Sequence, residues 1–146
     1  MTGEREAENA AVAGELRAAL SQLMRRLREQ TEGSDLTKSQ SAVLGRLERE
    51  GANTATALAR AEGVRPQSMA AILAALEADG LIAGRPDPTD RRKTIVELTE
   101  KAHAEFRAGR HARQDWLTQA IGSRLDPDEV ARLAESVELL RRLGNA

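Results

Sequence analysis

The stretch LEADGLIAGRPDPTDRRKTIVELT, residues 76–99, decides the fold because it changes from a helical pattern to a strand pattern. Its first residues complete the apolar stripe of a helix, and Gly80 is a residue type that commonly ends one. Residues 81–85 and 94–98 are short apolar or β-branched runs, and the charged, turn-forming stretch 86–92 separates them. We therefore predict a β-hairpin directly after a helix, and this is the only strand pattern in the chain.

Two short helices are predicted immediately before this hairpin. Leu58 is the main core residue of an Ala-rich helix over residues 54–62, and Pro66 begins a helix that runs to about residue 79. The turn Gly63-Val64-Arg65 joins them, and a helix-turn-helix uses a turn of three or four residues that often contains Gly. The second helix of such a unit, the recognition helix, lies in the major groove of DNA, and a hairpin that follows it is a wing.

Two further helices precede the helix-turn-helix. An apolar stripe predicts the first over residues 11–29, whereas residues 1–10 are acidic and are expected to fray. Thr37 and Gln40 have the spacing of a capping box, which predicts the start of the second helix, and Gly51 is expected to end it.

Two long helices are predicted after the hairpin. Thr99 is a suitable cap for a helix over about residues 100–121, and Asp126-Pro127-Asp128-Glu129 starts another with an Asp cap, a Pro and a Glu. The apolar stripes of the first and the last two helices are too extensive for a small monomer to bury. The predicted fold is mainly α, a single domain over residues 1–146 with six helices and a two-stranded wing.

The overall composition restricts the function classes. The 146 residues are 40% hydrophobic and include no cysteine, which excludes disulfides, thiolate nucleophiles and cysteine redox switches. The polar start resembles no signal peptide and no apolar run approaches the length of a membrane span, so a cytoplasmic protein without membrane contact is expected. Because the formal net charge is −1, DNA binding would depend on a locally basic face.

No catalytic or metal-binding arrangement can be assembled from the sequence. A Ser/His/Asp set, a Gly-rich phosphate loop and a zinc-protease motif are all missing. His103 and His111 are the only histidines, and they lie about 12 Å apart on one predicted helix, too far to share a metal ion. We predict no enzyme, no cofactor and no metal site. Phe106 and Trp116 are expected in the core or in an interface, with a ligand pocket as the alternative.

The chain resembles the MarR family of bacterial regulators from about Leu16 to Leu143. The family shows a recognition helix that ends in Leu-Glu-x-x-Gly-Leu, an Arg in the first wing strand, an acidic-basic wing tip and a Leu-Thr helix cap. The corresponding residues here are Leu76-Glu77-Ala78-Asp79-Gly80-Leu81, Arg85, Asp87-Pro88-Thr89-Asp90-Arg91-Arg92-Lys93 and Leu98-Thr99. The resemblance implies a winged helix-turn-helix that binds double-stranded DNA.

The resemblance implies a role for each wing residue. Arg92, and Arg91 beside it, would enter the minor groove, where an arginine responds to groove shape as well as charge. Asp90 would hold the arginine through a charge-assisted hydrogen bond. Lys93 would contact phosphate, and Arg85 would brace the base of the wing against the helices.

The candidate residues of the recognition helix are Arg65, Gln67, Ser68 and Ala71, which lie off its apolar face. A glutamine can recognise adenine, and an arginine can recognise guanine or a phosphate. For Gln67 and Ser68 the alternative is an ordinary helix surface. The outer side of this helix is rich in alanine, so shape readout is expected to contribute more than direct base contacts.

As a member of such a family, the protein would act as a homodimer. Residues 1–30 and 100–146 would dimerise, and residues 36–99 would form the DNA-binding lobe. The dimer would repress transcription from a pseudo-palindromic operator, and a small aromatic or phenolic ligand would release it. One alternative is a winged protein that binds protein partners or small molecules without recognising DNA. The other is a small-molecule-binding or catalytic helical domain, which requires a deep pocket with perturbed titratable groups away from the wing.

Overall fold

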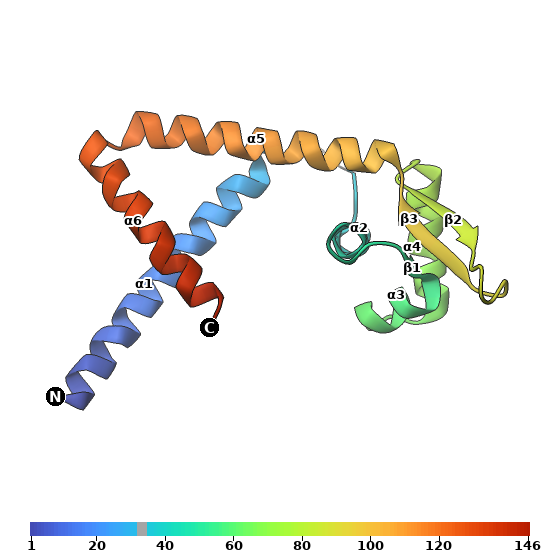
Figure 1. Cartoon of the computed structure of the whole chain (residues 1–146), viewed down its shortest axis with the longest axis horizontal. Coiled ribbons are helices and arrows are strands. Elements are labelled where there is room, and N and C mark those ends of the chain that lie inside the picture. Colours follow the sequence, from blue (N-terminus) through green and yellow to red (C-terminus); the bar gives the residue numbers. More distant parts are fainter. Residues whose placement is uncertain (32–34) are drawn as a thin grey trace. The chain divides into compact units, whose positions relative to one another are not determined.

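A computed structural model describes residues 1–31 and 35–146 of the chain, which divides into two units. One unit contains residues 33–108, and the other combines residues 1–32 with residues 109–146. Figure 1 shows the order of helices and strands along the chain. Six helices and a small antiparallel sheet are present in the described residues, as the predicted mainly α, winged fold requires.

Helix α2 (Lys38–Glu50) begins and ends where the sequence predicts. The Thr37 side chain accepts a hydrogen bond from the Gln40 amide at 3.1 Å, and the Gln40 side chain accepts one from the Thr37 amide at 3.0 Å. This reciprocal pair is the expected capping box. At the other end Gly51 has φ +84°, a backbone conformation that favours glycine.

The helix-turn-helix consists of α3 (Ala55–Glu62) and α4 (Pro66–Ala78), as predicted. The Thr54 hydroxyl caps α3 by accepting a hydrogen bond from the Ala57 amide at 3.1 Å. Pro66 occupies the first turn of α4, where its missing N–H costs no hydrogen bond.

The sheet has three strands, one more than the sequence analysis predicts. The hairpin strands β2 (Ile82–Pro86) and β3 (Thr94–Leu98) are present, and β2 lies one residue later than expected. The missed strand β1 (Asn53–Thr54) pairs with the other edge of β3, with Asn53 opposite Val96. Two residues cannot display an alternating pattern, so this strand exists only because the folded chain brings it beside β3.

The unit of residues 33–108 has one core, to which α2, α3, α4 and the sheet all contribute. Leu58 and Leu76 are completely buried, and Met69 is 1% exposed. Phe106, on helix α5 (Glu100–Arg124), packs against the same core. The buried members are Val43, Leu44, Leu47, Leu58, Ala59, Met69, Leu73, Leu76, Leu81, Ile82, Val96 and Ala102. Because one side of α4 is fixed in this core, its opposite side must face outward.

The second unit consists of α1 (Thr2–Glu29), the later part of α5 (Glu100–Arg124) and α6 (Pro127–Gly144). The prediction that residues 1–10 fray is wrong, because α1 begins at Thr2. Six of those ten residues are Glu, Ala or Arg, which are strong helix formers, and Glu4 complements the positive end of the helix dipole.

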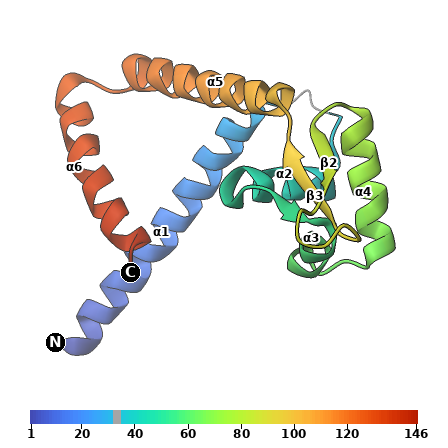
Figure 2. The same cartoon turned by 45° about the vertical axis from the view of Figure 1, so that its right-hand side comes forward.

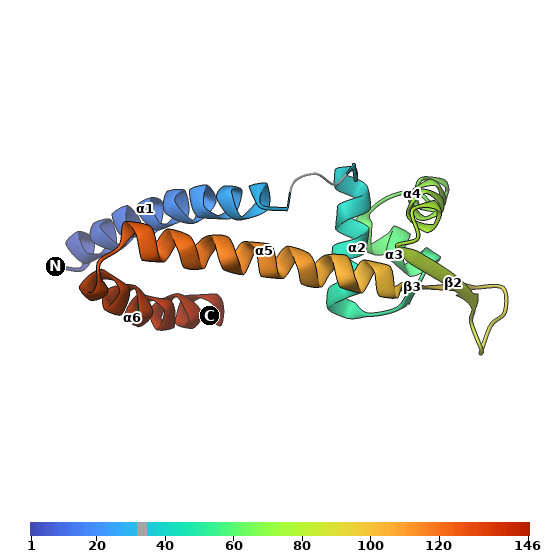
Figure 3. The same cartoon turned by 90° about the horizontal axis from the view of Figure 1, so that it is seen from above.

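The remaining helix boundaries agree with their capping signals. Thr99 accepts a hydrogen bond from the Ala102 amide at 3.3 Å at the start of α5, which ends three residues later than expected. Asp126 and Glu129 form a second capping box at the start of α6. Neither α1 nor α6 contains a buried residue, and in Figure 3 they lie on either side of α5.

Within residues 1–31 and 35–146, none of the helices has both the length and the apolar character that crossing a membrane requires.

Candidate nucleic-acid interface

The turn between α3 and α4 is held by hydrogen bonds of its own backbone. Gly63 adopts the left-handed conformation, with φ +66° and ψ +31°. Its amide donates to the Arg60 carbonyl at 3.3 Å, and the Val64 amide donates to the Ala59 carbonyl at 3.0 Å. These two bonds form a Schellman motif, which ends α3 sharply and directs the chain into α4.

An arginine joins α2 to the end of α3. Arg46 Nε donates to Glu62 Oε1 at 2.6 Å, and Arg46 also pairs with Glu50 at 3.1 Å. The hydrogen bond to Glu62 is the main reason why the pKa of the Arg46 guanidinium is raised. Since Glu62 immediately precedes Gly63, this contact fixes the turn that leads to α4. The sequence does not predict this contact, because the two partners are 16 residues apart.

The predicted recognition residues lie on the exposed side of α4. Arg65 is the N-cap residue of the helix and makes no side-chain cap hydrogen bond. Gln67, Ser68 and Ala71 are exposed, whereas Met69 on the opposite side is buried. The helix therefore offers its first two turns to solvent, with two polar side chains and several alanines on that surface.

The two strands of the wing are joined by backbone pairing and by an ion pair. Arg85 lies opposite Ile95, and its Nε is 3.7 Å from Glu97 Oε2 on β3. This partner is on the neighbouring strand, so the observed ion pair braces the hairpin itself rather than a helix. Gly84 allows a close approach, because a Cβ there would lie 3.1 Å from Thr94 Cγ2.

The wing tip is ordered by two aspartates. Asp87 Oδ1 accepts hydrogen bonds from the Thr89 amide at 2.9 Å and from the Thr89 hydroxyl at 2.8 Å. Asp90 Oδ1 accepts a hydrogen bond from the Arg92 amide at 3.1 Å and lies 3.4 Å from Arg92 Nε. The two side chains that are expected to share a charge-assisted hydrogen bond therefore form an ion pair, and the hydrogen bond to Asp90 comes from the Arg92 backbone amide. The Lys93 amide closes the turn on the Asp90 carbonyl at 3.0 Å.

The basic side chains of the tip point into solvent despite this local order. The Arg92 side chain is 94% exposed, and Arg91 and Lys93 are also exposed. An exposed ion pair such as Arg92–Asp90 stabilises the fold little. The ion pair instead limits the orientations of the Arg92 side chain, and the carboxylate does not neutralise the rest of the tip.

The candidate residues of the recognition helix and those of the wing tip lie at the same end of the unit of residues 33–108. Figures 1 and 2 show that the N-terminal end of α4 and the tip of the β2–β3 hairpin both lie away from the first turn of α5. In Figure 3 the tip projects beyond α3 and α4. A rod-like anion such as duplex DNA could therefore meet both surfaces at once. Arg85 is set back from the tip, in the strand.

The two aromatic residues occupy different environments. Phe106 is a core residue, as the sequence analysis expects. Trp116 is half-buried, and the Arg26 guanidinium lies 5.6 Å from the centre of its ring, within the range of a cation–π interaction. Trp116 also lines a hollow of about 520 Å³ with Leu23 and Ala120.

Comparison with known proteins decides the family. Residues 36–94 match the MarR family. An HTH-type transcriptional regulator of Mycobacterium tuberculosis is 35% identical over 135 residues, which are 92% of this chain and 94% of the relative. The chain belongs to the MarR family. It is a transcriptional regulator of that family and not an enzyme.

Solved structures support this assignment. A transcriptional regulator protein from Pseudomonas aeruginosa is 36% identical, with a TM-score of 0.77, and the match covers 95% of this chain and 97% of that one. A mutant MepR from S. aureus, solved bound to an oligodeoxyribonucleotide, has the same fold with a TM-score of 0.68 at 22% identity, over 90% of this chain and 96% of MepR.

Proposed function

We propose that this MarR family protein binds a pseudo-palindromic DNA operator as a homodimer and represses transcription. The observation that carries the proposal is the ordered basic wing tip at the same end of the unit as the exposed start of α4. The four recognition-helix candidates would face the major groove, and the wing tip would face the adjacent minor groove. The DNA-bound MepR structure supports the proposal because MepR shares this fold.

Each candidate residue has a proposed role. Arg92 and Arg91 enter the minor groove, with Asp90 holding Arg92, and Lys93 contacts phosphate. Arg85 stabilises the hairpin that presents them. On α4, Arg65 contacts guanine or phosphate, Gln67 and Ser68 contact base edges, and Ala71 permits close approach of the helix.

Dimerisation would place two such surfaces about one DNA turn apart. The helices of the unit that combines residues 1–32 and 109–146 would form the dimer, because their apolar side chains are exposed in one chain. Release by a small aromatic or phenolic ligand completes the proposal. Such a ligand must bind more tightly to a dimer whose recognition helices are wrongly spaced.

The proposal is tested first by fluorescence anisotropy. A labelled duplex from the region upstream of the gene is titrated with the protein at two salt concentrations and against competitor DNA. We expect tight binding that survives the competitor and weakens steeply with salt, because bound phosphates release counterions. Failure of a folded protein to bind at low salt would favour a protein-interaction module. The net charge of −1 and the alanines on the outer side of α4 are the observations behind that second candidate.

The variant Arg92→Ala tests the wing. It should weaken operator binding by more than about 1 kcal/mol without unfolding the protein. It should also reduce the slope of log affinity against log salt concentration by about one. Arg107→Ala is a matched control, since Arg107 is also an exposed arginine paired with a carboxylate, that of Glu100. Equal affinities of the two variants would remove Arg92 from the interface.

A further inference from the structure

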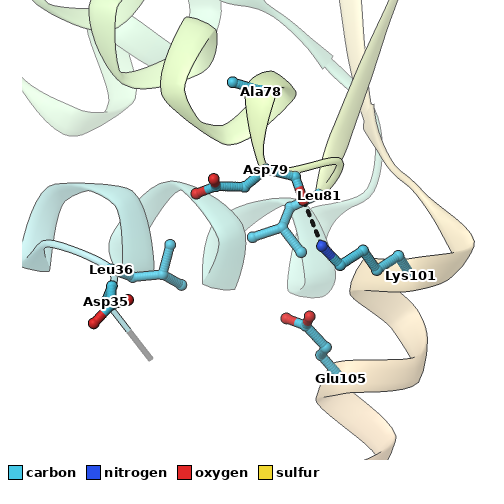
Figure 4. Close-up of a pocket in the computed structure, with 7 residues that line it drawn as sticks. All are labelled: Asp35, Leu36, Ala78, Asp79, Leu81, Lys101 and Glu105. Atoms are coloured by element: carbon cyan, nitrogen blue, oxygen red, sulfur yellow. Dashed lines mark hydrogen bonds between the residues drawn. The ribbon is translucent and has the colours of Figure 1, made fainter. Parts of the chain in front are cut away.

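The C-terminal end of the recognition helix is fastened to the first turn of α5. Lys101 Nζ donates a hydrogen bond to the Asp79 backbone carbonyl at 2.7 Å, which Figure 4 shows as a dashed line. The Thr99 hydroxyl donates to the Gly80 carbonyl at 2.6 Å, and the Thr99 amide donates to the Leu81 carbonyl at 3.1 Å. Three consecutive carbonyls after α4 therefore have their partners in one short segment of chain.

These carbonyls need outside partners because the helix cannot supply them. The last carbonyls of an α-helix are acceptors that find no N–H donor within the helix. At the end of α4 the Leu81 amide donates to the Leu76 carbonyl at 3.0 Å, and the Gly80 amide donates to the Glu77 carbonyl at 2.9 Å. This Schellman motif leaves the Asp79 carbonyl to Lys101. A cation at the negative end of the helix dipole is also electrostatically favourable.

The backbone at the end of α4 brings Gly80 close to the stem of Lys101. Gly80 has φ +72°, and a Cβ on it would lie 3.7 Å from Lys101 Cδ. The lysine stem therefore passes directly beside the residue that ends α4. Lys101 and Asp79 line a hollow of about 650 Å³ with Leu36, Leu81 and Glu105. Lys101 and Asp79 are both exposed, so water can reach the carbonyl if the ammonium is removed.

We propose that Lys101 is a positioning residue for DNA recognition, an inference that rests on the proposed function. Thr99 directly follows β3, the strand that carries the wing, and Lys101 lies two residues later. The same segment therefore holds the base of the wing and the far end of α4. Through its hydrogen bond to the Asp79 carbonyl, Lys101 fixes the orientation of α4 relative to the wing.

Lys101 acts without touching DNA. The 13 residues of α4 separate it from Arg65 by about 20 Å at the usual helical rise. A phosphate contact and a positioning contact predict different effects of Lys101 on the salt dependence of DNA binding. Only a phosphate contact releases counterions and so contributes to that dependence.

The test compares Lys101→Met with Lys101→Arg, which keeps a positive donor near the carbonyl. We expect Lys101→Met to weaken operator binding about three- to tenfold, as for loss of one ordinary hydrogen bond at a solvent-exposed site. Its affinity for non-specific DNA and its salt dependence should be unchanged. Lys101→Arg should stay within about twofold of the wild type, and Arg107→Ala controls for the loss of one positive charge from α5.

Amide hydrogen exchange of the free protein provides a second measurement. The Asp79 and Gly80 amides should exchange faster in Lys101→Met but not in Lys101→Arg, because the end of α4 is then free to fray. Unchanged operator affinity, or an equal loss on specific and non-specific DNA with a smaller salt dependence, would overturn the positioning role. If the wild type binds no DNA at all, the proposed function fails first, and the exchange result still shows whether Lys101 holds α4.

Discussion

At the scale of single residues, the wing tip depends on two aspartates that act on their own neighbours. Asp87 accepts two hydrogen bonds from Thr89, one from the backbone and one from the hydroxyl. These bonds favour the ionised carboxyl, and the backbone bond is the larger cause of the lowered pKa of Asp87. A carboxyl whose pKa is lower in the folded chain than in the unfolded chain stabilises the fold above the unfolded pKa. That contribution is lost as the pH falls through the folded pKa.

A pH titration therefore reports the order of the wing tip. The Asp87 carboxyl, followed by NMR, should titrate below the same group in the urea-unfolded chain. Thr89→Ala should move its pKa upward without abolishing the difference, because the backbone donor remains. Identical titrations in the folded and unfolded chains would mean that the turn is not formed in solution.

The residues of the site differ in how well the sequence predicts them. The Asp90–Arg92 contact was predictable because its partners are two residues apart and match a family pattern. The contacts of Arg46 with Glu62 and of Lys101 with Asp79 were not, because 16 and 22 residues separate the partners. Such contacts depend on how helices pack, and neither periodicity nor capping patterns contain that information. The DNA-binding roles of the nine candidate residues remain predictions.

At the scale of elements, the turn between α3 and α4 depends on the left-handed conformation of Gly63. Gly63→Ala should lower the free energy of unfolding by about 1–2 kcal/mol, the cost of placing a Cβ in that conformation. Gly45→Ala is the control, since Gly45 is inside α2 and its Cβ would meet only the flexible end of Arg49, at 3.1 Å. It should be neutral or stabilise the protein by up to about 1 kcal/mol. Urea unfolding measures the free energy of unfolding of both variants. Similar changes in the two would contradict the left-handed conformation of Gly63.

Elements with local end signals were predicted well, and those without them were not. Thr37, Thr99 and Asp126 each cap a helix that begins where expected. Strand β1 has only two residues, so its partner β3 rather than its own sequence makes it a strand. The predicted start of α1 is wrong because it rests on the apolar stripe alone, whereas Ala, Glu and Arg favour helix without burial.

At the scale of the whole molecule, an imbalance of burial distinguishes the two units. Every helix of the unit of residues 33–108 contributes buried residues, whereas α1 and α6 contribute none. Helices owe most of their stability in proteins to the packing of an apolar face, so α1 and α6 require a partner surface. Their large exposed side chains include Val12, Leu20, Leu23, Met24, Val130, Leu133, Val137, Leu139 and Leu143. A second copy of the chain would supply the matching surface in the homodimer that we propose.

A glutamate in the stripe of α6 tests this dimer. Val137→Glu should convert the dimer into monomers in sedimentation, because a charge would be buried among apolar side chains. Arg142→Glu introduces the same residue on the far side of the helix and should leave the dimer intact. The melting temperature of the wild type should also rise with protein concentration, since folding and association are coupled. A wild type that sediments as a monomer, with a melting temperature independent of concentration, would require α1 and α6 to be covered within one chain. Operator half-sites one turn apart would then lose their structural basis.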